Sequence, residues 1–220
     1  YDNPYSPIPN CHLLINDKKK IFLIADSYKI KKIINDKKVN FKQIIEPKNF
    51  EYIINKQKRG KILIDNKSCS IFYENLFKKN FEVIKKEDPI YLLKSIKNEN
   101  EINCMVDAHI SDGAALTKFL YWIKKINKKK ITEVDAEKKL ESFRKKNSKY
   151  LFPSFNTIAG TGKNGAIVHY RANKKNTRKI NKNDIFLCDS GGQYKFGTTD
   201  VTRTLCFSKP KNNIKDIFTK

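Results

Sequence analysis

The feature that most constrains the fold of this chain is a change in hydrophobic periodicity at Asp88-Pro89. Before this dipeptide, apolar runs of strand length alternate with segments of helical spacing, which predicts a small α/β domain over residues 1–87. After it, helical patterns come first and strand-like runs follow, which predicts an α+β domain over residues 88–220. We therefore expect two domains.

The elements predicted for residues 1–87 are short. An Asn16-Asp17 turn between two apolar runs predicts a β-hairpin. Further strands and helices alternate after it. The predicted strands are 12–15, 21–25, 61–65 and 81–84, and the predicted helices are 28–34, 47–56 and 70–77.

Helix-capping signals organise the first part of residues 88–220. Pro89 suits the first turn of a helix that Asp88 caps. Thr132 and Asp135 form a variant capping box at the start of another helix. The predicted helices begin at 89 and span 99–126 and 132–146, and the predicted strands are 156–159, 166–169, 185–189 and 198–207. The long helix has an expected apolar stripe of Met105, Ile110, Ala114, Leu116, Phe119, Leu120 and Ile123.

The chain is strongly basic, with a formal net charge of +23 from 46 Lys and Arg against 23 Asp and Glu. A nucleic-acid footprint concentrates basic residues on one element. Here the lysines form short clusters along the whole chain and are interleaved with acidic residues. We therefore expect a general lysine background with weak polyanion binding at low salt, and no specific nucleic-acid partner.

The number of cysteines and the length of the apolar runs indicate in which cellular compartment the protein lies. The five cysteines are odd in number and contain no CxxC pair, so a reducing, cytoplasmic location is favoured over a disulfide framework. Cys188 lies in an apolar strand-like run and is predicted to be a core residue. The apolar runs are too short to span a bilayer, so we expect no membrane partner.

Residues 184–207 carry the clearest chemical signal. Two strand-like runs flank a Gly-rich turn region, with Asp189 ending the first run and Asp200 inside the second. Residues on facing antiparallel strands lie about 5 Å apart, so the two carboxylates could face each other across a hairpin. Oxygen ligands of this kind suit Mg, Mn or Ca.

Each candidate residue also has an interpretation that needs no metal. Asp189 begins Asp-Ser-Gly-Gly, a common turn sequence. Asp200 could instead pair with Arg203, and both interpretations of Asp200 stay open. His169, one of three histidines, follows an apolar run, where a histidine by itself more often packs or faces solvent than binds a ligand.

Several blocks of the chain resemble the aminopeptidases P, which are X-Pro aminopeptidases of the pita-bread metallopeptidase fold. The most specific blocks are DSGGQY at 189–194 and GTTDVTRT at 197–204. Blocks in the same order as in that family are LLKSIKN at 92–98, AHI at 108–110, SFNTI at 154–158 and NGAIVHY at 164–170. The resemblance is strong over about 88–210. It is weaker before that, where the pattern is similar to the middle domain of three-domain members.

The resemblance implies roles for individual residues. Asp189 and Asp200 would hold two divalent metal ions, usually manganese, with Asp200 bridging both. His169 would contact the substrate near the scissile bond and stabilise the tetrahedral intermediate. Thr202 and Arg203 would lie beside the ligands. The family removes an N-terminal residue when proline follows it, by means of a hydroxide activated by two metals.

The resemblance also implies that this sequence is incomplete. Residues 1–87 would be a creatinase-type α/β middle domain lacking its N-terminal part, and 88–220 the first part of an α+β pita-bread domain. The family needs a further His and two Glu as ligands, and these do not occur up to Lys220. We expect the chain to be inactive without the remaining part of the catalytic domain, and organelle targeting stays open.

Two alternatives within the same fold remain. A catalytically inactive pita-bread module would bind protein or nucleic acid, and such relatives usually lose their metal ligands. A prolidase would act on dipeptides, whereas an aminopeptidase P acts on longer peptides with proline in second position. The family resemblance also implies a homodimer.

Overall fold

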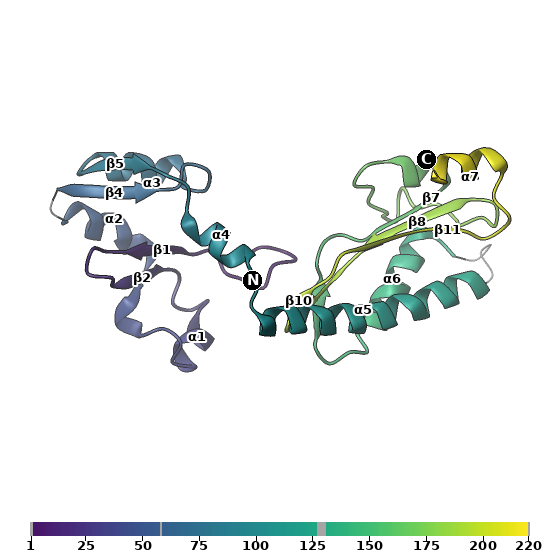
Figure 1. Cartoon of the computed structure of the whole chain (residues 1–220), viewed down its shortest axis with the longest axis horizontal. Helices are drawn as coiled ribbons and strands as arrows, with labels where there is room; N and C mark the ends of the chain where they lie inside the picture. Colours follow the sequence, from purple (N-terminus) through teal and green to yellow (C-terminus); the bar gives the residue numbers. More distant parts are fainter. Residues whose placement is uncertain (1, 58, 127–130, 220) are drawn as a thin grey trace. The chain divides into compact units, whose positions relative to one another are not determined.

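The computed structural model describes residues 2–57, 59–126 and 131–219 (Figure 1). The chain divides into two compact units. Unit 1 consists of Tyr1–Asn3 and Pro7–Lys97, and unit 2 of Pro4–Ser6 and Asn98–Lys220. The division between Lys97 and Asn98 lies one short helix beyond the boundary that the sequence pattern predicted, because α4 (Pro89–Ser95) is grouped with unit 1.

The strands of unit 1 form small sheets. β1 (His12–Ile15) and β2 (Ile21–Ile24) form an antiparallel hairpin, and β3 (Ile44–Ile45) joins β2 in parallel. β4 (Gly60–Ile64) pairs in parallel with β5 (Phe81–Lys85). The predicted hairpin and the two later strands are confirmed.

The described residues of unit 1 form four α-helices, of which the second and third contribute buried side chains to its core. Asp88 caps α4 by accepting a hydrogen bond from the Ile90 amide at 2.9 Å, which confirms the predicted cap. The predicted helix 28–34 begins only at Lys31. The other helices are α1 (Lys31–Asn35), α2 (Pro47–Asn55) and α3 (Ile71–Lys78), and the core contains Ile24, Ile45, Phe50, Ile54, Ile64, Leu76 and Phe77.

Unit 2 places helices on one face of an antiparallel sheet. The helices are α5 (Glu99–Lys125) and α6 (Glu133–Arg144), and the Thr132–Asp135 capping box predicted for α6 is present. The sheet has the order β11 (Val201–Cys206), β8 (Ile185–Ser190), β7 (Ile158–Thr161). Figure 1 shows α5 and α6 on one side of this sheet, and α7 (Asn212–Thr219) on the other.

The core of unit 2 lies between these helices and the sheet. Leu116, Phe119 and Ile123 of α5 pack with Phe186 and Cys188 of β8. Cys188 is 1% exposed, so its predicted place in the core is confirmed. Burial raises the pKa of its thiol to about 12, which keeps the side chain neutral.

Two expectations for unit 2 were wrong, and one sheet was not foreseen. Ile110 is 66% exposed, because the buried stripe of α5 is shifted to include Ala108 and Asp112 instead. Residues 166–169 form no strand: a 3-10 turn (Gly162–Ala166) leads into an exposed segment in which Val168 is 82% exposed. A second small sheet was not foreseen: it has the order β10 (Gly197–Thr198), β9 (Gly192–Tyr194), β6 (Tyr150–Pro153).

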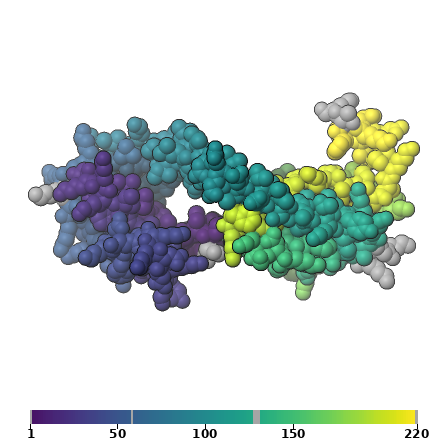
Figure 2. Space-filling model, turned by 60° about the horizontal axis from the view of Figure 1, so that its bottom comes forward, coloured from purple at the N-terminus to yellow at the C-terminus, as the bar shows by residue number. Residues whose placement is uncertain are grey.

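The C-terminal helix is amphipathic, and Figure 2 shows it, in yellow, projecting from the rest of its unit. Its Ile217 and Phe218 are 75% and 81% exposed. Across residues 2–57, 59–126 and 131–219, no helix is both long and apolar enough to cross a bilayer.

Candidate active site

The two candidate carboxylates lie on one continuous antiparallel hairpin. Asp189 pairs directly with Thr202, whose hydroxyl donates a 2.7 Å hydrogen bond to Asp189 Oδ1. The same register continues through β9 and β10, where Thr198 pairs with Gln193. Asp200 is therefore set opposite Gly191. The expectation that the two aspartates face each other directly is corrected to a diagonal placement, for which antiparallel positions lie about 7–8 Å apart.

Glycine is required at position 191 by the close approach of the neighbouring chain. A Cβ atom at Gly191 would lie 1.9 Å from the Thr199 carbonyl oxygen and 2.2 Å from Ser154 Oγ. Ser154 Oγ itself donates to that carbonyl at 2.8 Å. The backbone that carries Asp200 is thus held tightly against the end of β8.

Strand alternation places the candidate site on the face of the sheet away from α5 and α6. Phe186, Cys188 and Ser190 are buried, whereas Asp189 between them is partly exposed and points to the other face. Thr202 shares that face through its direct pairing with Asp189.

The segment before His169 crosses the same face of the sheet. Gly165 packs closely on the sheet. A Cβ atom added to Gly160 of β7 would lie 2.8 Å from Gly165 Cα, and a Cβ atom added to Gly165 would lie 3.6 Å from Leu187 Cβ of β8. Leu187 is two residues before Asp189, so it shares its face. The chain leading to His169 therefore lies over the sheet on the side that carries Asp189. His169 is exposed and has a left-handed backbone, with φ of 54°.

Arg203 occupies a different position from Thr202. It pairs with Cys188, whose side chain faces the helices, so alternation turns Arg203 away from the face of Asp189. Its guanidinium donates to the Thr202 carbonyl at 2.7 Å. Among the ion pairs formed by the described residues, none joins Asp200 to Arg203.

The two candidate carboxylates would by themselves supply only part of the ligands of a metal site. Their oxygens suit hard divalent cations such as Mn²⁺. Over the parts of the chain that the structure describes, no three His, Cys, Asp or Glu side chains are grouped closely enough to hold a metal ion. As candidate ligands, Asp189 and Asp200 would need further donors to complete such a site.

A buried ion pair behind the site escaped the sequence interpretation. Arg144 of α6 donates to both Asp112 carboxylate oxygens and, through Nη2, to Ser190 Oγ at 3.1 Å. Ser190 directly follows Asp189 and is fully buried. The signal that could have found this contact is the interruption of the apolar stripe of α5 by a charged residue.

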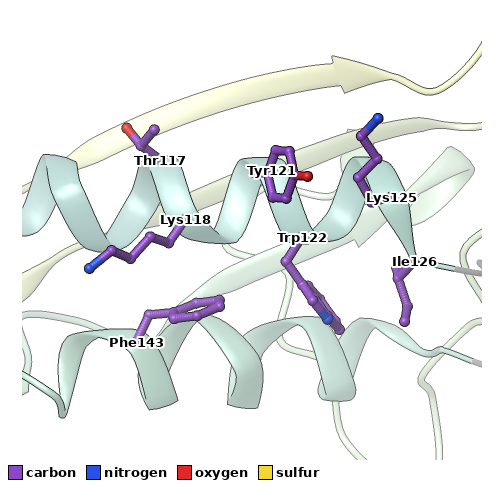
Figure 3. Close-up of a pocket in the computed structure, with 7 residues that line it drawn as sticks. All are labelled: Thr117, Lys118, Tyr121, Trp122, Lys125, Ile126 and Phe143. Carbon is purple, nitrogen blue, oxygen red and sulfur yellow. The ribbon is translucent and has the colours of Figure 1, made fainter.

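A groove of about 670 Å³ lies on the helical side of unit 2 and not at the carboxylates. Figure 3 shows Trp122 of α5 and Phe143 of α6 directed into the space between the two helices. The other lining residues are Thr117, Lys118, Tyr121, Lys125 and Ile126. Because the groove borders α5 and α6, it is separated from the face that carries Asp189.

Comparison with known sequences covers nearly the whole chain. Residues 103–220 match the metallopeptidase family M24, and residues 1–101 match the creatinase/prolidase N-terminal domain. Xaa-Pro aminopeptidase 1 of Dictyostelium discoideum is 37% identical in an alignment of 215 positions that covers 90% of this chain and 34% of that protein. Xaa-Pro aminopeptidase ApepP of Drosophila melanogaster is 45% identical over 139 residues, 62% of this chain and 23% of that protein. The chain thus spans about a third of the first of these relatives and about a quarter of the second.

Solved structures share the fold. An X-prolyl aminopeptidase from Caenorhabditis elegans, described as a cytosolic enzyme with a di-nuclear active site, superposes with a TM-score of 0.80 at 26% identity, covering 96% of this chain and 36% of that one. The prolidase of Pyrococcus furiosus superposes with a TM-score of 0.75 at 23% identity, covering 97% and 60%. The fold is therefore a creatinase-type domain followed by pita-bread structure, as expected, and the chain belongs to metallopeptidase family M24.

Proposed function

We propose that the natural protein in which this chain occurs removes the N-terminal residue from peptides with proline in second position. The observation that carries the proposal is that the register of the hairpin sets Asp189 and Asp200 on one face. The relatives named Xaa-Pro aminopeptidase support the choice of substrate. A proline in second position leaves the scissile amide without an N–H, so ordinary aminopeptidases handle it poorly.

In this proposal the candidate residues of the chain have separate roles in binding metal and substrate. Asp189, oriented by the Thr202 hydroxyl, and Asp200 would together supply carboxylate oxygens to a pair of divalent cations, which we take to be Mn²⁺. When bound, such cations activate water and polarise the carbonyl of the scissile bond. His169, four residues beyond Gly165 on the segment that crosses the Asp189 face, would donate a hydrogen bond to the substrate carbonyl as charge develops on its oxygen.

The rest of the site would come from sequence outside these 220 residues. Since the described residues group no three metal-ligating side chains, we expect the 220-residue chain to be inactive when it is expressed alone. We also propose a cytoplasmic location, in keeping with five free cysteines, and a homodimer as the assembled form.

The test uses the purified natural protein loaded with Mn²⁺. It should cleave Xaa-Pro-Yaa tripeptides, with Asp200→Asn abolishing cleavage and releasing metal. Asp107→Asn, the same change at an exposed carboxylate of α5, is the control and should retain activity. Cleavage of Xaa-Pro dipeptides alone would indicate a prolidase instead. Absence of both cleavage and stoichiometric metal would indicate a binding module.

A further inference from the structure

The most heavily hydrogen-bonded side chain of unit 2 is a buried carboxylate with no place in the proposed chemistry. Glu133, in the first turn of α6, is 0% exposed. It accepts hydrogen bonds from the amides of Thr161 and Arg178, both at 2.8 Å. It also accepts from the Asn164 side-chain amide at 3.1 Å and from the Tyr170 hydroxyl at 2.8 Å.

These donors all belong to one stretch of chain. Thr161 is its first residue and Arg178 its last, so Glu133 ties both ends of the segment 161–178 to α6. Tyr170 and Asn164 attach its interior to the same carboxylate. The Glu133 amide adds a return hydrogen bond to the Arg178 carbonyl at 3.0 Å. The segment is thus closed around Glu133, which acts as its anchor.

Apart from glycine, His169 is the residue of the segment 161–178 that has a left-handed backbone. It is exposed, and its φ of 54° is uncommon for a residue with a side chain. The preceding residues Ile167 and Val168 are exposed as well. Tyr170, which follows directly, is 6% exposed and is the nearest residue along the chain that is fixed by packing.

The tyrosine hydroxyl joins several groups at once. It donates to Glu133 Oε2, accepts from Asn164 Nδ2 at 2.8 Å, and lies 3.1 Å from the Asn176 carbonyl. Burial, followed by the hydrogen bond to Glu133, raises the pKa of Tyr170 to about 12. The hydroxyl therefore keeps its proton and remains a donor to Glu133 across the working pH range.

We propose that Glu133 and Tyr170 are positioning residues that hold His169 in its left-handed conformation over the Asp189 face of the sheet. This inference rests on the proposed function, in which His169 contacts the substrate. Neither side chain touches the reacting atoms, so both act through His169.

The test is a double-mutant cycle in the Mn²⁺-loaded natural protein. Tyr170→Phe removes one hydroxyl and should lower kcat for an Xaa-Pro-Yaa peptide about 10-fold, because the His169 side chain is misplaced. Metal content should not change. In the His169→Ala background, Tyr170→Phe should have no further effect on kcat, since the residue through which it acts is gone.

The matched control is Tyr150→Phe. Tyr150 also donates its hydroxyl to a glutamate of α6, Glu141, at 2.6 Å, but it lies in β6 and outside the segment 161–178. This variant loses a comparable hydrogen bond and should keep kcat within about twofold of the unmodified protein. Amide hydrogen exchange of residues 166–171 should quicken in Tyr170→Phe and not in Tyr150→Phe.

The outcomes separate the two proposals. An unmodified protein that does not cleave Xaa-Pro peptides overturns the proposed function, and this inference with it. An active protein in which Tyr170→Phe leaves kcat unchanged overturns the inference alone. So does an active protein in which Tyr170→Phe lowers kcat by the same factor with and without His169.

Discussion

Arg144 and Asp112 form a doubly hydrogen-bonded ion pair inside unit 2, with Nε 2.7 Å from Oδ1 and Nη2 3.0 Å from Oδ2. The side chains are 1% and 3% exposed. The pair joins α6 to α5, and Arg144 extends it to Ser190 at the end of β8. A contact between residues 32 positions apart thus holds the strand that carries Asp189.

Replacing only one partner of this pair should lower the stability of the protein far more than replacing both. Arg144→Met leaves the Asp112 carboxylate buried without a counter-charge and should lower the free energy of unfolding by about 3–5 kcal/mol. The double variant Arg144→Met/Asp112→Leu should be markedly more stable than this single variant. Urea unfolding of the natural protein measures both. Equal losses in the single and double variants would contradict the role assigned to the buried charge.

Alkaline pH should destabilise unit 2 through Cys188. Its folded pKa of about 12 is above the ordinary value of 9.0, so the unfolded state loses its proton first as the pH rises. The contribution of the neutral Cys188 thiol to the free energy of unfolding is fully present below pH 9 and decreases progressively toward pH 12. At pH 10.5 the loss from this thiol should be about 2 kcal/mol.

The measurement for Cys188 compares urea unfolding at pH 7.5 and pH 10.5. Cys188→Ala should have a lower free energy of unfolding at both pH values because it leaves a cavity. Its free energy of unfolding should, however, fall less between pH 7.5 and pH 10.5 than that of the unmodified protein. Tyrosine ionisation affects both proteins and cancels in this difference. If the free energy of unfolding falls by the same amount in both proteins, the Cys188 thiol does not cause the loss of stability at alkaline pH.

Two glycines should respond to alanine in opposite ways. Gly191→Ala drives a methyl group into the Thr199 carbonyl and should destabilise the protein by more than about 2 kcal/mol. Gly113→Ala in the middle of α5 meets no atom within 4 Å and should stabilise it by about 0.5–1 kcal/mol. Thermal unfolding of the two variants provides the comparison, and a tolerated Gly191→Ala would disprove the close approach at the hairpin.

The hydroxyl of Thr202 should tune metal affinity. Thr202→Val removes the hydrogen bond that orients Asp189 and should weaken Mn²⁺ binding to the natural protein about 10-fold, measured by calorimetric titration. Thr204, on the same strand and the same face, pairs with Leu187 instead. Thr204→Val should leave the Mn²⁺ affinity unchanged. Similar losses of affinity in both variants would show that any threonine-to-valine change in β11 weakens Mn²⁺ binding, and that the Thr202 hydroxyl has no special role.

The sequence by itself determined the local structure and the family. The cap of α4 by Asp88 and the capping box of Thr132 and Asp135 were predictable, because their hydrogen bonds join residues within three positions. The hairpin from 12 to 24 was predictable from strand propensity and its turn. The chemical candidates were recognisable because the blocks at 189–194 and 197–204 resemble those of the aminopeptidases P, whereas the residues alone also allowed a turn at Asp189 and an ion pair at Asp200.

Tertiary structure decided where those groups lie. Hairpin register set Asp189 opposite Thr202 and not opposite Asp200, and only pairing along the whole ladder fixes such a register. Residues 166–169 had the composition of a strand, yet the segment passes over the sheet and is tied down through Glu133. Burial of Asp112 depended on an arginine in another helix. These contacts join residues far apart in the chain, and no local propensity encodes them.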